Sequence, residues 1–322
     1  MQTGQHIEPG TRLVLTQRLK DNELVAEECR SLTGVAPEED IAWGAETRFI
    51  GRGAFLGQAM EVIASGHDLA SLCEETRERT SGMDLTGFRI TIVNRTDRDV
   101  TIPDHVVPLA DAIPWYPDLT HPRFELALLV TDTHWLLTCI VDEIDRGYRI
   151  HDGKPGRTSY SMPTQLARAM VNLLPRTSRS ILDPCCGTGS LPLEALSLGF
   201  QVSCGDLNPN LVQMTNENLA HFGYEPCAVE QDARSWHGHF DAVITDVPYG
   251  RYNHTREAGE QLTREILSTL PALAPLAIIV AEVDFSDVLR TVGFSDVAAF
   301  RVVKFTGLTR YVHRASLGAL ES

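Results

Sequence analysis

The segment Thr245–Gly250 reads TDVPYG and follows an apolar run, DAVI. Proline is unfavourable inside a central strand, so Pro248 is expected just beyond the end of one. This order of residues suits methyl transfer to an amine conjugated to a ring, whose delocalised lone pair makes it a weak nucleophile. The Asp246 carboxylate and a main-chain carbonyl near Val247 or Pro248 can accept its two N–H groups and aim the lone pair at a methyl donor.

Tyr249 completes the motif, because its ring can stack on a planar base and hold it. Asp246 should act as the ionised carboxylate, which accepts more hydrogen bonds than the protonated acid, and no metal is needed. A strand end followed by an ordinary turn would also account for DVPYG, since Pro and Gly are common at turns. The interpretation therefore depends on whether a methyl donor binds nearby.

A site for such a donor is predicted at ILDPCCGTGSLPLE. An apolar strand ends at Asp183, a turn with Gly187 and Gly189 follows, and a helix begins at once. Glycines let the backbone turn tightly and approach a ligand closely, so Cys185 and Thr188 of this turn are also expected to contact it. The turn is neither a Walker loop nor a full GxGxxG fingerprint.

Acids at the ends of later strands strengthen this interpretation. Asp206 lies about 20 residues after the turn, where a ribose-binding carboxylate is expected, and Asn208 follows it. The segment CAVEQD ends in Asp232, followed by Ala233, where an acid could face an adenine amine. Each acid alone could cap a helix. Together with Asp246 they are expected at the same end of one sheet, which favours a nucleotide-like ligand.

The second half of the chain alternates apolar strands with helical segments, which predicts a parallel sheet with helices on both faces. In the first half, residues 20–33 and 57–79 favour helices and three apolar segments favour strands, which indicates a smaller α+β region. Residues 151–163 are rich in Gly, Pro and Ser and are expected to form an exposed connection, followed by a helix that ends at Pro175. The expected strands are FRITIVN, FELALLV and WLLTCIVDEI in the first half, and SILDPC, QVSCGD, CAVEQD, DAVITDVP and AIIVAEVD in the second.

The net charge of −15 is unusual for a nucleic-acid-binding protein, but basic side chains are concentrated in residues 151–180 and 301–314. Such clusters could also be ordinary solvated surface. The seven cysteines form no CxxC pair, which favours reduced thiols and a cytoplasmic location. No long apolar run or signal sequence predicts a membrane anchor.

These motifs resemble a known family. DPCCGTGSLPLEAL, GDLNPNLV, EQDA and TDVPYGR are similar to the amino-methyltransferases that use S-adenosylmethionine. Within that group the chain is most similar to the archaeal-type, THUMP-domain tRNA guanine-N2 methyltransferases, which also have a basic linker and an LARAMVNL helix before the glycine turn. The tail FTGLTRYVHRASL resembles the family's last strand. The resemblance covers residues 151–314 well and residues 1–150 weakly.

The resemblance implies an α/β fold, with a Rossmann-like class I methyltransferase domain of seven strands preceded by an α+β region. The implied domains are a ferredoxin-like module at 1–70, a THUMP-like RNA-binding domain at 71–150, a linker at 151–165 and the methyltransferase domain at 166–322. S-Adenosylmethionine would be bound by Asp183, Cys185, Gly187, Thr188, Gly189, Asp206, Asn208, Asp232, Ala233 and Asp246. The catalytic residues would be Asp246, Pro248 and Tyr249. RNA would be bound by Lys154, Arg157, Arg168, Arg251, Arg310 and Arg314.

Two features depart from the family pattern: Val247 replaces the first proline of Asp-Pro-Pro-Tyr, and residues 1–150 are acidic. The expected activity is methylation of a guanosine N2 amine in tRNA, at position ten, by a monomer without a metal. An adenine-N6 methyltransferase acting on DNA or another RNA would use the same motif. Protein glutamine-N5 methyltransferases usually have Asn where this chain has Asp246. An inactive RNA-binding relative is disfavoured, because every expected catalytic position is filled.

Overall fold

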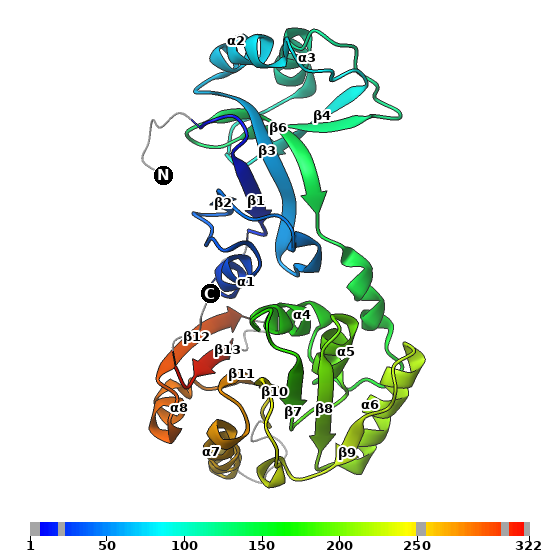
Figure 1. Cartoon of the computed structure of the whole chain (residues 1–322), viewed down its shortest axis with the longest axis vertical. Helices are drawn as coiled ribbons and strands as arrows, with labels where there is room; N and C mark the ends of the chain where they lie inside the picture. The colour runs from blue at the N-terminus through cyan, green and yellow to red at the C-terminus, as the bar shows by residue number, and fades with distance from the viewer. Residues whose placement is uncertain (1–6, 19–22, 249–255, 304–308, 319–322) are drawn as a thin grey trace. The chain divides into compact units, whose positions relative to one another are not determined.

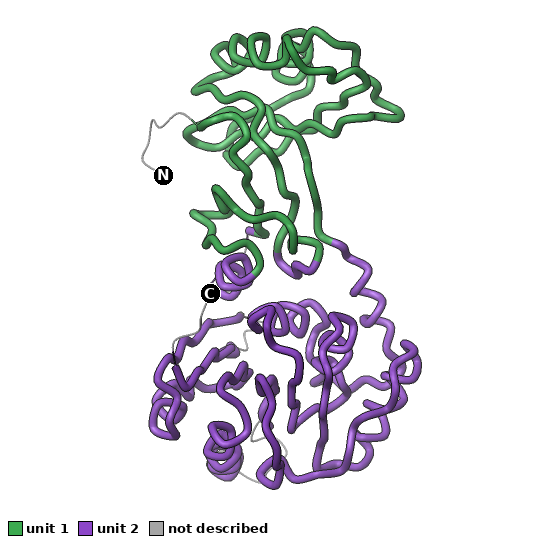
Figure 2. The backbone as a smooth tube through the Cα atoms, viewed as in Figure 1, with its two compact units in different colours: residues 1–17, 32–51, 56–144 green, residues 18–31, 52–55, 145–322 purple. Residues whose placement is uncertain are grey.

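The computed structural model describes residues 7–18, 23–248, 256–303 and 309–318 (Figure 1). The chain divides into two compact units (Figure 2). Unit 1 comprises residues 1–17, 32–51 and 56–144, and unit 2 comprises residues 18–31, 52–55 and 145–322. Among the described residues, no helix combines the length and the apolar character needed to cross a membrane.

Unit 1 is built on a six-stranded sheet with the strand order β2-β1-β3-β6-β5-β4. Neighbouring strands are antiparallel except β4 and β5, which are parallel. Helices α2 and α3 pack on a core that includes Leu72, Leu109, Leu126 and Leu128. The elements are β1 (Arg12–Thr16), β2 (Ile41–Trp43), β3 (Leu56–Gly66), α2 (Leu69–Thr80), β4 (Phe88–Asn94), α3 (Val107–Ala112), β5 (Phe124–Val130) and β6 (Trp135–Glu143).

The helix predicted over residues 57–79 is wrong in its first half, because residues 56–66 form strand β3 and only α2 is helical. Strand β3 pairs with β1 on one side and with β6 on the other, and this non-local pairing overrides the helix propensity of QAME. The turn between the two elements requires Gly66, since a Cβ there would lie 2.5 Å from the amide nitrogen of Leu72. Asp68 then caps α2 by accepting from the Ser71 amide.

Unit 2 is built on a seven-stranded sheet with the order β12-β13-β11-β10-β7-β8-β9. The five neighbouring strands β11, β10, β7, β8 and β9 are parallel, as predicted. Strand β13 is antiparallel to both of its neighbours. The strand order reverses direction at β7, which has β8 on one side and β10 on the other. The strands are β7 (Ser180–Asp183), β8 (Gln201–Asp206), β9 (Ala228–Glu230), β10 (Ala242–Asp246), β11 (Leu276–Ala281), β12 (Asp296–Val303) and β13 (Thr309–Ser316).

Helices cover both faces of this sheet, because consecutive buried residues on each strand belong to different cores. Ile181 and Ile244 pack with α4 and α5, whereas Leu182 and Val243 pack with α7 and α8. This alternation confirms the predicted α/β sandwich. The helices are α4 (Thr164–Asn172), α5 (Ser190–Ser197), α6 (Pro209–His221), α7 (Arg256–Leu273) and α8 (Ser286–Val292).

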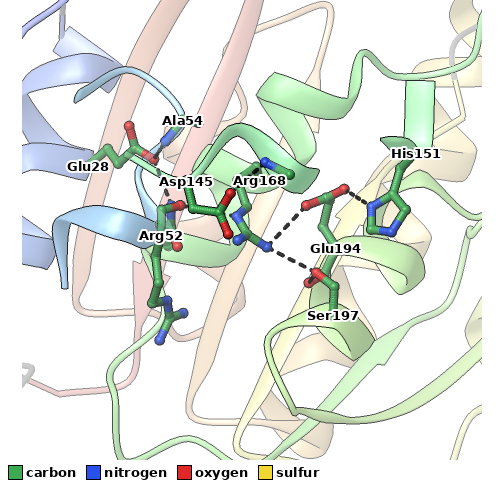
Figure 3. A network of polar contacts seen from close by, with 10 residues as sticks. Glu28, Arg52, Ala54, Asp145, His151, Arg168, Glu194 and Ser197 are labelled. Carbon is green, nitrogen blue, oxygen red and sulfur yellow. Dashed lines mark hydrogen bonds and ion pairs between the residues drawn. The ribbon is translucent and has the colours of Figure 1, made fainter. Parts of the chain in front are cut away.

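Two segments from early in the sequence complete unit 2, namely residues 18–31, which contain most of α1 (Glu23–Thr33), and residues 52–55. The Glu28 carboxylate is fully buried and accepts hydrogen bonds from the amides of Ala54 (2.7 Å) and Phe55 (2.8 Å). It also accepts one from Nδ2 of Asn172 on α4, at 2.7 Å. Figure 3 shows Glu28 beside the Ala54 segment. Burial raises the pKa of Glu28.

The predicted division of the first half at residue 70 stays a prediction. Strand β3 lies before that position and β6 after it, yet the two pair along their length in one sheet. From residue 145 onward the whole chain belongs to unit 2.

Replacing Glu28 with Ala should lower the free energy of unfolding of unit 2 by about 3 kcal/mol, because three buried donors would lose their acceptor. Urea unfolding followed by circular dichroism measures this. Glu74→Ala, an exposed change on α2, is the control and should alter stability by less than about 0.5 kcal/mol. Equal effects of the two changes would contradict the assigned role of Glu28.

Candidate active site

A cavity of about 570 Å³ opens at the carboxyl ends of β7, β8 and β10, next to the point where the strand order reverses. This is where ligands bind in open α/β sheets. The wall includes ten of the residues predicted to bind cofactor or substrate: Asp183, Cys185, Gly187, Thr188, Asp206, Asn208, Asp232, Ala233, Asp246 and Pro248. Gly189 is not part of the wall.

The glycine turn between β7 and α5 requires both of its glycines, and Gly189 for a second reason as well. Gly187 has φ of 55° and Gly189 has φ of 78°, both in the left-handed region. A Cβ on Gly189 would also lie 2.9 Å from Cγ2 of Thr215. The Thr215 hydroxyl donates to the Gly187 carbonyl at 2.8 Å. Helix α6 therefore holds the turn close to the cavity, and Gly189 acts through this packing rather than by lining the wall.

Asp206 ends β8 and joins the turn to the next loop. Its Oδ2 accepts from the Gly187 amide at 3.0 Å, and its Oδ1 accepts from the Asn208 amide at 2.9 Å. Each carboxylate oxygen has a second lone pair that can accept from another donor. Burial raises the pKa of Asp206.

Asp183 ends β7 and is the most deeply buried acid of the site. Its Oδ1 accepts from the Thr245 hydroxyl at 2.8 Å and from the Cys185 amide at 3.3 Å. Its Oδ2 is buried and has no hydrogen-bond partner among the described residues. Burial, together with the like charges of Asp206 and Asp246, raises the pKa of Asp183 to about 8. A cationic donor in the cavity would satisfy this oxygen.

Asp232 follows β9 and caps the short helix that begins at Ala233. It accepts from the Arg234 amide at 2.9 Å and forms an ion pair with the Arg234 guanidinium at 2.6 Å. These hydrogen bonds lower the pKa of Asp232. The cap interpretation of this acid is therefore correct, and Asp232 also lines the cavity.

Asp246 lies at the end of β10, where its Oδ2 is 3.2 Å from Nη1 of Arg310. The carbonyl of Pro248, beyond the strand, accepts from the hydroxyl of Thr263 at 3.3 Å. Asp246 and Pro248 thus follow each other in the chain, and both residues line the cavity. Tyr249 and Arg251 lie outside the described residues.

The segment predicted to be an exposed linker forms one wall of the cavity, and four of its residues are functional candidates that were not predicted: Thr158, Tyr160, Ser161 and Met162. The Ser161 hydroxyl lies 2.9 Å from that of Thr188, and Ser190 donates to the Met162 carbonyl at 2.9 Å. Small polar residues in a Gly- and Pro-containing stretch carry no signal that distinguishes a wall from a loop. Val247, whose carbonyl was one of the two candidate acceptors, also lines the cavity. The other wall residues that were not predicted are Pro184, Cys186, Ser190, Leu191, Leu207, Leu211, Arg234, Leu262 and Ile266.

The prediction that Lys154 and Arg168 are surface contacts for RNA is corrected by their burial. Lys154 is 6% exposed and donates to the Thr188 hydroxyl at 3.1 Å, and burial lowers its pKa to about 8. Arg168 is 7% exposed and forms an ion pair with Glu194 at 3.3 Å (Figure 3). His151 contacts the other oxygen of the same carboxylate. Both cations are therefore bonded to partners inside unit 2.

The other predicted RNA contacts differ in exposure. Arg310 is 3% exposed because it pairs with Asp246 inside the site. Arg314 is half-buried and pairs with Glu27 of α1. Arg157 is exposed. Among the described members of the set, only Arg157 has the exposure expected of a phosphate contact.

The sheet order, the glycine turn and the acids at the strand ends together define a Rossmann-like methyltransferase fold. Residues 146–310 match the RMKL-like methyltransferase domain, and the chain belongs to this family.

Curated relatives match part of the chain. The chain is 30% identical over 171 residues to the tRNA (guanine(10)-N2)-dimethyltransferase of Pyrococcus abyssi, covering 50% of this chain and 52% of the relative. It is 41% identical over 114 residues to the enzyme of the same name from Methanothermobacter thermautotrophicus, covering 34% of each. Human tRNA (guanine(6)-N(2))-methyltransferase THUMP3 is 26% identical over 216 residues, 58% of this chain and 41% of the relative. The matches thus span about half or less of the relatives' length.

Solved structures support the fold. TrmN from Thermus thermophilus superposes with a TM-score of 0.54 at 18% identity, over 95% of this chain and 100% of the other. SMU.472, a putative methyltransferase complexed with SAH, gives a TM-score of 0.52 at 14% identity, over 98% of this chain and 100% of the other. At such identities the likeness concerns the fold alone.

Asp183 should make folding stability depend on pH. Its pKa rises from 3.8 to about 8 on folding, so the folded state binds the proton more tightly than the unfolded chain. This contribution is complete below about pH 4 and is lost as the pH rises through about 8. The difference in free energy of unfolding between wild type and Asp183→Asn should therefore fall steadily from about pH 5 to pH 8 and then level off, as measured by urea titrations.

Asp241→Asn is the control for this measurement. The amides of Ser180 and Arg179 lower the pKa of Asp241, so its contribution is lost only in acid and should not change over the same range. A constant difference for Asp183→Asn between pH 5 and 8 would show that Asp183 titrates normally.

Proposed function

We propose that the chain transfers a methyl group from S-adenosylmethionine to the exocyclic N2 amine of a guanosine in tRNA. The observation that carries the proposal is that Asp246 and Pro248 line the same cavity as the glycine turn. An NH₂ group that is hydrogen-bonded to two adjacent acceptors can be methylated only if the methyl donor lies on its open side. The names of the curated relatives support the choice of guanine and of tRNA.

The residues of the cavity fit this cofactor. The buried Oδ2 of Asp183, which has no hydrogen-bond partner among the described residues, suits the ammonium group of the methionine moiety. The spare lone pairs of Asp206 suit the ribose hydroxyls, and Asp232 with the Ala233 backbone suits the adenine amine. Cys185, Thr188 and Asn208 complete the predicted contacts. When bound, the cofactor supplies an electrophilic methyl group.

Asp246 would accept one N–H of the guanine amine and the Pro248 carbonyl the other. Both contacts favour a tetrahedral nitrogen over the planar, conjugated one, so they are stronger in the transition state than with the free base. In this arrangement the Asp246 carboxylate would also accept the proton that the methylated nitrogen must lose. Tyr249 completes the proposed motif as a stacking platform for the base.

Unit 1 and Arg157 are the proposed RNA-binding parts. The assignment of a ferredoxin-like module, a THUMP-like domain and position ten of tRNA rests on the family resemblance. A cytoplasmic location is proposed from the sequence, whose seven cysteines form no CxxC pair. Adenine-N6 methylation of DNA or another RNA, and glutamine-N5 methylation of protein, remain the competing activities, because they need the same pair of acceptors.

Asp246→Ala should lower kcat by at least about 100-fold, since it removes one of the two acceptors, while the Kd for S-adenosylmethionine stays within a few fold. Calorimetry measures the Kd. Transfer is measured with labelled cofactor and tRNA, total RNA, DNA and protein in parallel, followed by nucleoside analysis. Label in N2-methylguanosine supports the proposal, whereas label in N6-methyladenine or glutamine would replace it with a competing activity. Lost cofactor binding would instead place Asp246 in the cofactor site.

Arg157→Glu should weaken tRNA binding and reduce the slope of log K against log salt concentration, because it replaces one phosphate contact with a repulsive charge. Fluorescence anisotropy over a salt series measures both quantities. Arg290→Glu, an exposed change on α8, is the matched control. An unchanged slope for Arg157→Glu would exclude this side chain as a phosphate contact.

A further inference from the structure

Arg310 reaches the catalytic acid from two strands away. It lies near the start of β13, which pairs with β11, and β11 in turn pairs with β10. In this register Val280 of β11 is opposite both Asp246 and Val312. The Arg310 side chain therefore extends across the end of β11, and its Nη1 lies 3.2 Å from Oδ2 of Asp246.

The burial of this pair distinguishes it from a surface ion pair. The Arg310 side chain is 3% exposed and that of Asp246 is 19% exposed. In such surroundings a charge-assisted hydrogen bond is directional and weakly screened, so it restrains the carboxylate plane. A side chain buried in this way also has little surface left for an RNA phosphate, which was its predicted partner.

Asp246 of this pair belongs to a group of acids that line the cavity. Asp206 and Asp246 end the strands on either side of β7, and the charges of both raise the pKa of Asp183. The Arg310 guanidinium adds a positive charge to this cluster of acids, beside Asp246.

We propose that Arg310 is a positioning residue for methyl transfer, which holds the Asp246 carboxylate in the orientation that accepts from the substrate amine. The proposal rests on the proposed function and assigns Arg310 no contact with substrate. Removing the guanidinium should therefore slow the chemical step and leave substrate and cofactor binding nearly unchanged.

The test compares R310Q and R310K with R290Q, in which an exposed arginine of α8 is replaced. R310Q should lower kcat on the order of 100-fold, because misplacement of a catalytic group costs about that much. Because Arg310 is assigned no contact with either ligand, the KM values for tRNA and for S-adenosylmethionine should change less than about threefold. R310K keeps the charge but not the planar fork, so its kcat should lie between those of R310Q and wild type.

A double-mutant cycle with D246N separates positioning from other roles. If Arg310 acts through Asp246, adding R310Q to D246N should lower kcat little further, whereas independent roles would multiply the two losses and overturn the proposal. A raised KM for tRNA at normal kcat would make Arg310 an RNA contact, and behaviour like R290Q would leave it no role; either result rejects the proposal. If melting curves show that R310Q does not fold, R310K alone decides by the same split between kcat and KM.

The same experiment tests the proposed function separately from the role of Arg310. All variants are assayed on the acceptor that wild-type enzyme methylates in the parallel assay. Wild type that modifies adenine or protein would overturn guanine as the substrate, while the kcat effect of R310Q on that acceptor would still test the role of Arg310.

Discussion

The structure of unit 2 depends on bringing acids together where water is scarce. Parallel strands deliver Asp183, Asp206 and Asp246 to one sheet edge. Burial raises the pKa of Asp183 and of Asp206, and the charges of Asp206 and Asp246 raise that of Asp183 further. The fold supplies donors of three kinds: backbone amides at Asp206, a hydroxyl and an amide at Asp183, and a guanidinium at Asp246. Each acid therefore has its own set of donors, which would suit a cofactor with both a cation and hydroxyl groups.

Residues 154–162 of unit 2 also hold this arrangement in place. Their lysine and hydroxyl groups are hydrogen-bonded to the glycine turn, and their backbone at Gly156 is held by Asn218 of α6. Basic side chains that a surface interpretation would assign to RNA instead satisfy buried oxygens. The acidic net charge of the chain is therefore an incomplete guide to its partners, since part of the positive charge faces inward.

The sequence was informative where structure follows local rules. The strands of unit 2 and the acids at their ends could be predicted, because buried strands are continuous apolar runs and parallel strands share an edge. Strand β3 could not, since its state is decided by partners far along the chain. The roles of Lys154, Arg168 and Arg310 were missed for the same reason, because their partners lie 34, 26 and 64 residues away. A pattern of charges in the sequence does not indicate whether a side chain points to solvent or into the protein.

The contact between Arg314 and Glu27 joins residues 287 positions apart. Glu28 likewise bonds to Asn172, 144 residues further along the chain. Helix α1 therefore leaves the ribosome long before the residues on which it packs have been synthesised. Such high contact order slows folding and leaves the apolar side of α1, including Leu24, exposed during translation. Newly made chains should therefore depend on chaperones that shield this helix until β13 has been synthesised.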